Sequence, residues 1–284
     1  MAFRFLDTYE EPVLVGEGAF GKVYRVKKRG TDAYYALKVI EQLAVWEREC
    51  RFLEHAEHHL FPTFVEKGES DGCYYILMEY IWGEDLSALL SRRGPFSPPD
   101  AMRIALTIAD GMAYLTQKDG TVLFRDLKAQ NIRITPEGNV KLMDFGCACT
   151  LDEANASIAG TKGYAPQEQL SFAAQTGAYS DVYAFGMLFH YLLTGENPQQ
   201  IKGRRKTLQE FDETASYALE LLLQDCTREE ANLRIPDMYI VLSRMLEIAS
   251  NTAWGYRKLE KRCKKELKRR GQDAQIIYEK NIHG

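Results

Sequence analysis

The order of hydrophobic and polar positions in the first eighty residues is typical of β-structure. Short stretches rich in β-branched and aromatic residues alternate with glycine-containing turns, a pattern that predicts strands. One stretch differs, because residues 41–57 follow a helical pattern. The expected strands are 13–15, 22–27, 34–40, 63–67 and 73–80.

From residue 84 onward the hydrophobic positions mostly recur with a period near 3.6 residues, which predicts helices. Two short strand patterns, at 132–134 and 140–143, interrupt them and are joined by a turn at 136–138. The expected helices are 101–115, 181–193, 217–223 and 238–248. We therefore expect an α+β chain in which a small β-rich lobe with one helix is joined, near residues 80–83, to a larger and mainly helical lobe.

The composition is that of a folded globular protein. Of the 284 residues, 45% are hydrophobic and 27% are charged, which excludes a disordered or fibrous chain as the main state. The longest apolar stretch, about 182–193, is too short to span a bilayer. The first ten residues have no apolar core of a secretory signal. Six cysteines in a chain of this length form no dense disulfide framework, so we expect reduced thiols and a cytoplasmic location.

The net charge of −4 is unevenly distributed. Residues 257–270 contain nine Lys or Arg and two Glu, so the rest of the chain is strongly acidic. An acidic body argues against a nucleic-acid-binding core. We expect the tail 251–284 to be helical and basic. It is either a solvated helix against the larger lobe or a contact for an anionic membrane or a partner protein.

Three glycines, Gly16, Gly18 and Gly21, form the first candidate site. In a dinucleotide-binding motif such glycines would follow a strand and open a helix, but here they lie between two expected strands. That context favours a β-hairpin that covers phosphate groups, since a backbone without Cβ can approach phosphate oxygens closely. An ordinary glycine-rich hairpin is the alternative.

Lys38 lies within an apolar strand, where a charge is unfavourable unless it is paired. Its functional interpretation is a cation for the α- and β-phosphates of ATP, held by a glutamate of the following helix. Glu47 and Glu49 are both candidates. We choose Glu49, because it precedes Leu53 by four residues and so shares its inward helix face. The alternative is a surface lysine on an edge strand.

The third motif is Phe-Arg-Asp-Leu-Lys-Ala-Gln-Asn at 124–131, followed by Asp-Phe-Gly at 144–146. It resembles the catalytic loop and metal-binding segment of eukaryotic-like protein kinases. Asp126, Lys128, Asn131 and Asp144 match in type, order and spacing, and the resemblance covers roughly residues 10–248. Lys128 two residues after Asp126 is typical of the serine/threonine branch.

The resemblance implies a two-lobed protein-kinase-like fold and transfer of the γ-phosphoryl group of ATP to Ser or Thr hydroxyls of protein substrates. Asp144 and Asn131 would bind Mg²⁺, which prefers oxygen ligands. Lys38 would hold the non-transferred phosphates, and Lys128 would offset charge near the γ-phosphate. Asp126 would orient the attacking hydroxyl and accept its proton. The implied division is an N-lobe at 1–82, a C-lobe at 83–250 and the tail at 251–284.

Residues 160–168 resemble the end of a kinase activation segment, in the form that prokaryotic members have. The resemblance implies that Thr161 bridges the catalytic Asp and Lys, and that Glu168 forms a buried ion pair with Arg234. Asp181 would bind amides of the catalytic loop. Ser157, four residues before Thr161, would be the activating phosphorylation site, with its phosphate bound by the arginine that precedes the catalytic aspartate.

The adenine site is likewise implied by the resemblance. Its residues would be Val15, Val23 and Ala36 as the roof, Met78 at the back, the Glu79 carbonyl and the Ile81 amide at the adenine edge, Asp85 at the ribose, and Arg133 as the floor. Arg133 replaces a usual apolar residue, and we expect its methylenes to cover the ring while its charged head reaches water.

The alternatives to a kinase are a nucleotide-binding pseudokinase scaffold and a small-molecule phosphotransferase. Phe124, where the family usually has His, and Arg133 support the pseudokinase. The complete set of catalytic residues argues against it. The segment that ends in Glu168, with its Arg234 partner, favours protein substrates over small molecules. The identity of the substrate and the oligomeric state do not follow from the sequence.

Overall fold

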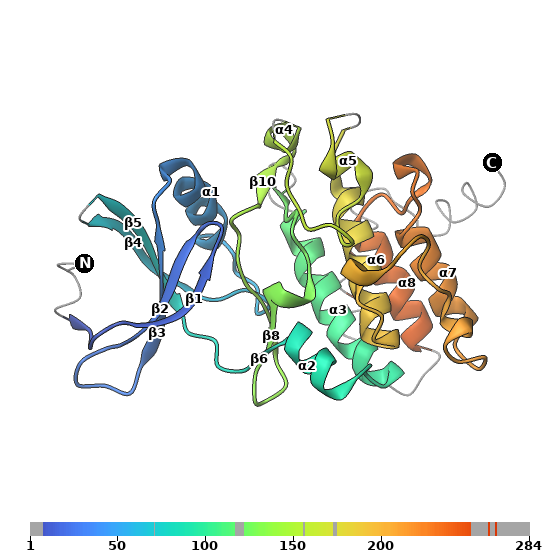
Figure 1. Cartoon of the computed structure of the whole chain (residues 1–284), viewed down its shortest axis with the longest axis horizontal. Helices are drawn as coiled ribbons and strands as arrows, with labels where there is room; N and C mark the ends of the chain where they lie inside the picture. The colour runs from blue at the N-terminus through green and yellow to red at the C-terminus, as the bar shows by residue number, and fades with distance from the viewer. Residues whose placement is uncertain are drawn as a thin grey trace. The chain divides into compact units, whose positions relative to one another are not determined.

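The computed structural model describes residues 8–70, 72–116, 122–155, 157–172, 175–250, 261 and 265. The chain divides into two compact units, Met1–Glu84 with Ile132–Ala148, and Asp85–Asn131 with Cys149–Gly284. Sheet structure dominates the N-terminal part of the chain and helices dominate the C-terminal part, so the predicted α+β class is confirmed (Figure 1). The expected tail lies outside the described residues, apart from the exposed Lys261 and Lys265.

The first unit is built on a five-stranded antiparallel sheet in the order β1-β2-β3-β5-β4. Its strands are β1 (Val13–Gly18), β2 (Gly21–Lys27), β3 (Tyr34–Ile40), β4 (Phe64–Ser70) and β5 (Cys73–Glu79). One side of the sheet carries an apolar cluster that includes Tyr9, Val26, Leu37 and Leu77. Because side chains alternate along a strand, Lys38 points to the other side from Leu37. Strand β3 is central, which excludes the interpretation of Lys38 as an edge-strand residue.

Helix α1 (Leu43–Leu53) connects β3 to β4 and is shorter than the helix expected over 41–57. Gln42 caps it without a side-chain hydrogen bond. After Leu53 the backbone tightens, since the amide of His55 donates to the Phe52 carbonyl at 3.3 Å, a bond that spans three residues. The helix presents Glu49 and Leu53 on its buried side, as the four-residue spacing predicted.

A hairpin from the middle of the chain completes the first unit. Strands β8 (Ile132–Ile134) and β9 (Val140–Leu142) pair in antiparallel fashion. The amide of Leu142 donates to the Leu60 carbonyl at 2.7 Å, which ties the hairpin to the segment after α1. This connection brings Asp144 into the same unit as Lys38 and Glu49.

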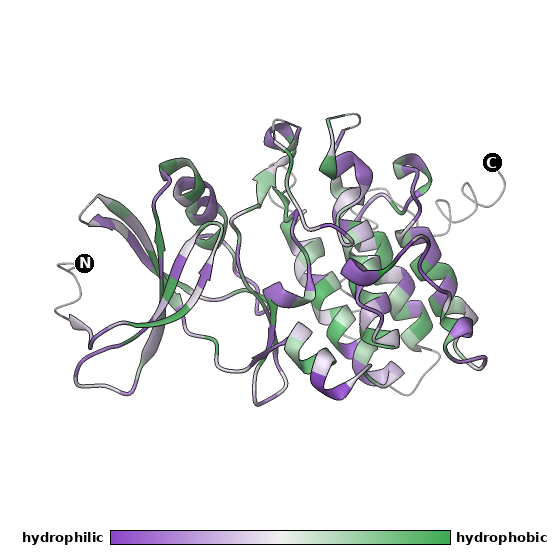
Figure 2. Cartoon of the chain, in the orientation of Figure 1, coloured by the Kyte–Doolittle hydropathy of each residue, from purple (hydrophilic) through white to green (hydrophobic). Residues whose placement is uncertain are grey.

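The second unit is mainly helical. Helices α3 (Pro98–Leu115), α6 (Ala178–Thr194), α7 (Tyr217–Cys226) and α8 (Met238–Ser250) pack on one another around α6. Hydrophobic and hydrophilic residues are interleaved along these helices (Figure 2). Shorter elements complete the unit: β6 (Glu84–Asp85, at the junction), α2 (Leu86–Arg93), β7 (Val122–Leu123), η2 (Ala129–Asn131), β10 (Cys149–Thr150), α4 (Leu151–Ala154), α5 (Gln167–Leu170), η3 (Pro198–Gln200), η4 (Leu208–Glu210) and η5 (Ala231–Leu233).

Local sequence explains where the long helices begin and end. Ser97 caps α3 by accepting from the Asp100 amide, and Pro98 occupies the first helical position, where its missing N–H costs nothing. Helix α6 ends at Gly195, whose φ of +72° is the left-handed conformation that glycine adopts without strain. Within the described part of the chain, no helix combines the length and the apolar character needed to cross a membrane.

Candidate active site

The first unit contains a buried lysine held by two carboxylates. Lys38 Nζ lies 2.7 Å from both Glu49 Oε1 and Oε2 and 2.7 Å from Asp144 Oδ1. Lys38 is 5% exposed and Glu49 is 1% exposed, whereas Glu47 is exposed to solvent. Burial alone would lower the pKa of Lys38, but the charges of Glu49 and Asp144 outweigh it and raise that pKa above its usual value. Lys38 is therefore a fixed cation, and Glu49 is the partner chosen from the sequence.

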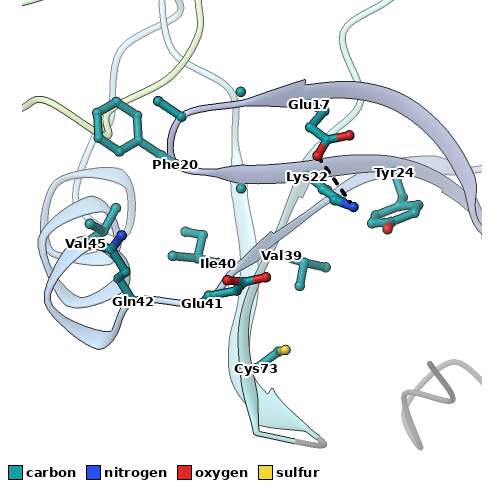
Figure 3. Close-up of a pocket in the computed structure, with 13 residues that line it drawn as sticks. Glu17, Phe20, Lys22, Tyr24, Val39, Ile40, Glu41, Gln42, Val45 and Cys73 are labelled. Atoms are coloured by element: carbon teal, nitrogen blue, oxygen red, sulfur yellow. Dashed lines mark ion pairs between the residues drawn. The ribbon is translucent and has the colours of Figure 1, made fainter.

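The glycine-rich turn joins β1 to β2 (Figure 3). Gly21 is required by the fold, because its φ is +139° and a Cβ there would lie 2.0 Å from the Val39 carbonyl oxygen. At Gly16 and Gly18, by contrast, a Cβ would meet nothing within 4 Å. Two glycines that the hairpin itself does not need leave its backbone accessible to a ligand, which favours the phosphate-covering interpretation over an ordinary hairpin.

The tip of this hairpin reaches two other elements of the first unit. A Cβ on Gly146 would lie 2.5 Å from the Phe20 ring, so Phe20 packs directly on the glycine of the Asp-Phe-Gly segment. On the other side, the tip, the end of β3 and the start of α1 enclose a pocket of about 270 Å³ (Figure 3). Glu17 and Lys22 form an exposed ion pair of 3.5 Å at its rim. The glycine-rich turn thus packs on the expected metal-binding segment and lines a pocket together with the start of the helix that carries Glu49.

The residues expected around adenine lie mostly in the first unit. Ala36 pairs with Met78 across β3 and β5, and both side chains are buried. Val23 is half-buried and Val15 is 43% exposed. The side chain of Glu79 accepts hydrogen bonds from the Thr63 amide and Lys141.

Two residues of this set make hydrogen bonds that the sequence did not predict. Arg133 Nη1 donates to the Ile81 carbonyl at 3.0 Å, so its charged head binds the backbone after β5 instead of reaching only water. The long side chain folds back because a backbone carbonyl lies within its reach. Asp85, expected at the ribose, accepts from the Ala88 amide at 2.8 Å and caps α2 in the second unit. Its ribose contact stays a prediction.

The second unit contains the catalytic loop. Lys128 Nζ lies 2.7 Å from Asp126 Oδ2 and 2.9 Å from the Thr161 hydroxyl, which in turn donates to Asp126 Oδ1 at 2.6 Å. Asn131 Nδ2 donates to the Asp126 carbonyl at 2.9 Å and to Asp126 Oδ2 at 3.1 Å. The structure therefore brings together Asp126, Lys128, Asn131 and Thr161, and Thr161 bridges the aspartate and the lysine.

The backbone of this loop is strained at Arg125, and the Asp181 side chain binds it. Arg125 has φ +68°, in the left-handed region that non-glycine residues rarely adopt; in the first unit, Asp144 shares this conformation with φ +65°. Asp181 accepts from the amides of Phe124 (2.7 Å) and Arg125 (2.8 Å). Burial raises the pKa of Asp181 to about 6, although the two amides oppose the rise. Asp181 thus fixes the loop backbone directly before Asp126.

The Arg125 side chain connects the catalytic loop to the activation segment. Its Nη1 lies 3.2 Å from the Ser157 hydroxyl and 3.3 Å from Cys149 Sγ. The guanidinium is 2% exposed, and within the described residues its Nε has no hydrogen-bond partner. Gln169, which the sequence analysis missed, donates to the carbonyls of Arg125 and Ala159. Only its position directly after Glu168 could have drawn attention to it.

Glu168 and Arg234 form a buried ion pair of 2.6 Å. Glu168 also accepts from the Ser180 hydroxyl at 2.9 Å, and the Arg234 guanidinium lies 5.0 Å from the centre of the Tyr183 ring. The pair links the end of the activation segment to the segment before α8. Both side chains are less than a tenth exposed, so neither charge can be satisfied by water if the other is lost.

Replacing Arg234 by alanine is expected to lower the free energy of unfolding by about 3–5 kcal/mol, because Glu168 would remain as an unpaired buried carboxylate. Urea denaturation at neutral pH measures the change. Arg228→Ala is the matched control, since it removes an arginine from a more exposed ion pair with Asp225. Its expected cost is about 1 kcal/mol or less. Equal losses in the two variants would contradict a structural role for the buried pair.

Comparison with known proteins agrees with this geometry. Residues 9–262 match the protein kinase domain. The chain is 31% identical over 212 residues to serine/threonine-protein kinase pkn3 of Myxococcus xanthus, covering 67% of this chain and 38% of that protein. It is 30% identical over 207 residues to serine/threonine-protein kinase PrkC of Bacillus subtilis, covering 69% of this chain and 32% of that protein.

A plant relative, CBL-interacting serine/threonine-protein kinase 8 of Arabidopsis thaliana, is 29% identical over 70% of this chain and 46% of that protein. The matched region thus spans between about a third and a half of the length of these three relatives. The resemblance seen in the catalytic loop and the Asp-Phe-Gly segment is confirmed over most of the sequence, and bacterial kinases are among the relatives. The chain belongs to the protein kinase family.

Proposed function

We propose that the protein is an ATP- and Mg²⁺-dependent serine/threonine protein kinase. The observation that carries the proposal is the network of Asp126, Lys128 and Thr161, in which a lysine and a threonine hydroxyl fix both carboxylate oxygens of the aspartate. The names of the bacterial and plant relatives support the same activity. The buried Lys38 with Glu49 and Asp144 supports ATP as the donor.

The donor atoms available for Mg²⁺ fit that ion. The Asp144 side chain is 37% exposed, and a carboxylate is a hard oxygen donor of the kind that Mg²⁺ prefers. Asn131 makes its hydrogen bonds to the catalytic loop through Nδ2, which leaves its amide Oδ1 as a second oxygen donor. Bound Mg²⁺ would supply charge neutralisation for the phosphates of ATP.

Four side chains of the protein would bind the phosphates, activate the acceptor hydroxyl and stabilise the developing charge. Lys38, a permanent cation, would hold the non-transferred phosphates beneath the glycine-rich turn. Asp126 would orient the acceptor hydroxyl and take its proton as the new bond to the γ-phosphorus forms and the bond from that phosphorus to the β–γ bridging oxygen breaks, which releases ADP. Lys128 would offset the negative charge that develops on the transferred group. Thr161 would keep Asp126 and Lys128 in register.

The experiment that tests the proposal is incubation of the full chain with γ-labelled ATP, Mg²⁺ and a mixture of acidic and basic generic proteins. Wild type should transfer label, and the Asp126→Asn variant and a sample with the Mg²⁺ chelated should transfer little. Acid hydrolysis of the labelled proteins should release phosphoserine and phosphothreonine. The same labelling by wild type and Asp126→Asn would reject the kinase proposal.

No observation on the described residues favours a pseudokinase or a small-molecule phosphotransferase. Phe124 is fully buried and keeps its backbone bond to Asp181, and Arg133 has a hydrogen-bond partner. We further propose a cytoplasmic location, because the buried cysteines that the structure describes, Cys50, Cys73, Cys149 and Cys226, are reduced thiols. The basic tail at 257–270 remains a proposed contact for an anionic membrane or a partner, and no nucleic acid is expected.

We propose that Ser157 is autophosphorylated and that its phosphate binds Arg125. The Ser157 hydroxyl already lies 3.2 Å from Arg125 Nη1, and the buried guanidinium lacks a carboxylate ion-pair partner among the described residues. A phosphate would add about 1.5–2 negative charges at this position. It would therefore stabilise the activation segment around Thr161.

Ser157→Ala is expected to lower activity about fivefold. The effect is modest because Cys149 occupies the position where a second basic group would strengthen binding of the phosphate. Thr150→Ala, on the same segment, is the matched control and should have a smaller effect. Mass spectrometry after incubation with ATP should find phosphate on Ser157. An unmodified Ser157 together with a fully active Ser157→Ala variant would show that the segment is ordered by other means.

A further inference from the structure

The surface beside the acceptor position begins at Thr161, whose hydroxyl is fixed on Asp126 and Lys128. The next residue, Lys162, is exposed, and within the described residues its ammonium group has no ion-pair partner. One residue of extended chain spans about 3.5 Å. Because Lys162 directly follows a hydrogen-bond partner of Asp126, a peptide that presents its hydroxyl to Asp126 would carry its neighbouring side chains close to Lys162.

Two contacts extend this surface toward residues 198–202. A Cβ on Gly163 would lie 2.5 Å from the Pro198 carbonyl oxygen, so the backbone after Lys162 lies directly against η3. Gln130, in the catalytic loop, donates through Nε2 to Gln199 Oε1 at 3.1 Å. The catalytic loop, the activation segment and η3 therefore lie side by side within the second unit.

The exposed side chains gathered here are basic or uncharged. Gln199 and Gln200 are exposed amides, and Lys202 is an exposed cation without an ion-pair partner in the described part of the chain. Glu196, the carboxylate on the same segment, turns its Oε2 into the protein, where solvent does not reach it. No exposed carboxylate on 198–202 could receive a basic substrate side chain.

We propose that this surface selects serine or threonine acceptors in acidic sequence, with Asp or Glu side chains next to the acceptor, and disfavours acceptors flanked by Lys or Arg. The inference rests on the proposed function, since Asp126 marks the acceptor position only in a kinase. Carboxylates of the substrate would be attracted by Lys162 and Lys202, whereas basic side chains would be repelled by them. Exposed charge pairs of this kind change affinity by about two- to fivefold each.

The test uses the full chain and two serine peptides that differ only in their residues flanking the acceptor, three Glu in one and three Lys in the other. The acidic peptide should have a kcat/KM about tenfold higher, since at least two favourable pairs are replaced by repulsions. The preference should shrink toward unity as the salt concentration rises, because the Debye length falls from about 10 Å at 0.1 M to about 3 Å at 1 M.

The variant Lys162→Glu should remove most of the preference and raise the rate on the basic peptide, with the KM for ATP unchanged. Lys162→Gln should fall between that variant and wild type. Lys28→Glu, which changes the same charge at an exposed turn after β2, is the control and should keep the wild-type ratio.

Equal rates on both peptides in wild type, or an unchanged ratio in Lys162→Glu, would overturn the proposed preference for acidic sequences. The kinase proposal would remain intact. Absence of label in both peptides and in the generic proteins would instead mean that the proposed function is wrong, and the charge assignment would fall with it. A preference for the acidic peptide in wild type that mostly disappears in Lys162→Glu supports both.

Discussion

The Asp126→Asn variant is expected to turn over about 10²–10⁴-fold more slowly than wild type while folding and binding ATP normally. Asparagine has nearly the same shape as aspartate, so it fits between Lys128 and Thr161. It has no negative charge, however, and cannot accept the proton of the attacking hydroxyl. Its amide group would also place a second donor against Lys128 Nζ or Thr161, both of which now donate to carboxylate oxygens.

Three measurements check this expectation. The initial rate of phosphoryl transfer gives kcat, a fluorescent ATP analogue gives the nucleotide affinity, and thermal unfolding gives stability. Only the first should change strongly. Asp152→Asn removes an exposed carboxylate on α4 and should stay within about twofold of wild type, as expected for a surface position. Full turnover in Asp126→Asn would contradict the role of Asp126, and with it the kinase proposal that the Asp126 network carries.

The parts of this site that the sequence could predict are those defined by residue type and spacing. The choice of Glu49 over Glu47 followed from the four-residue helical repeat, and Lys38 was expected to need a partner because it lies within an apolar strand. Both expectations use local geometry, which a sequence carries directly. The contacts of Thr161 and Arg234 came from the family resemblance and are present in the structure.

The parts that could not be predicted depend on which distant segments meet. Nothing in the sequence near Gln169 shows that its amide would bind the Arg125 carbonyl, forty-four residues away. Likewise, the sequence does not show that the Ile81 carbonyl lies near Arg133, because the two become neighbours only once β8 lies beside the segment after β5. Arg133 was therefore expected to extend toward water. The sequence also did not predict that the β8–β9 hairpin belongs to the first unit, since a strand pattern does not show which distant segment the strand will contact.

Lys38→Met is the second variant with a large expected effect. Loss of the phosphate-binding cation should lower turnover about 10²–10³-fold, the usual cost of removing one preorganised group that stabilises charge. The structure adds a consequence for stability. Glu49 is 1% exposed, and without Lys38 its carboxylate would be buried beside Asp144 and would have lost its ion-pair partner. Such an unpaired charge typically lowers the free energy of unfolding by about 3–5 kcal/mol.

The double variant Lys38→Met/Glu49→Gln separates these two effects. The neutral amide that replaces the Glu49 carboxylate removes the buried charge, so stability in urea denaturation should return most of the way to wild type. Turnover should stay low, because the cation for the phosphates is still missing. The stability loss of the single variant should also shrink as the pH falls, since burial raises the pKa of the unpaired Glu49 and protonation removes its charge. Recovery of turnover together with stability in the double variant would mean that Lys38 acts only by holding α1 in place.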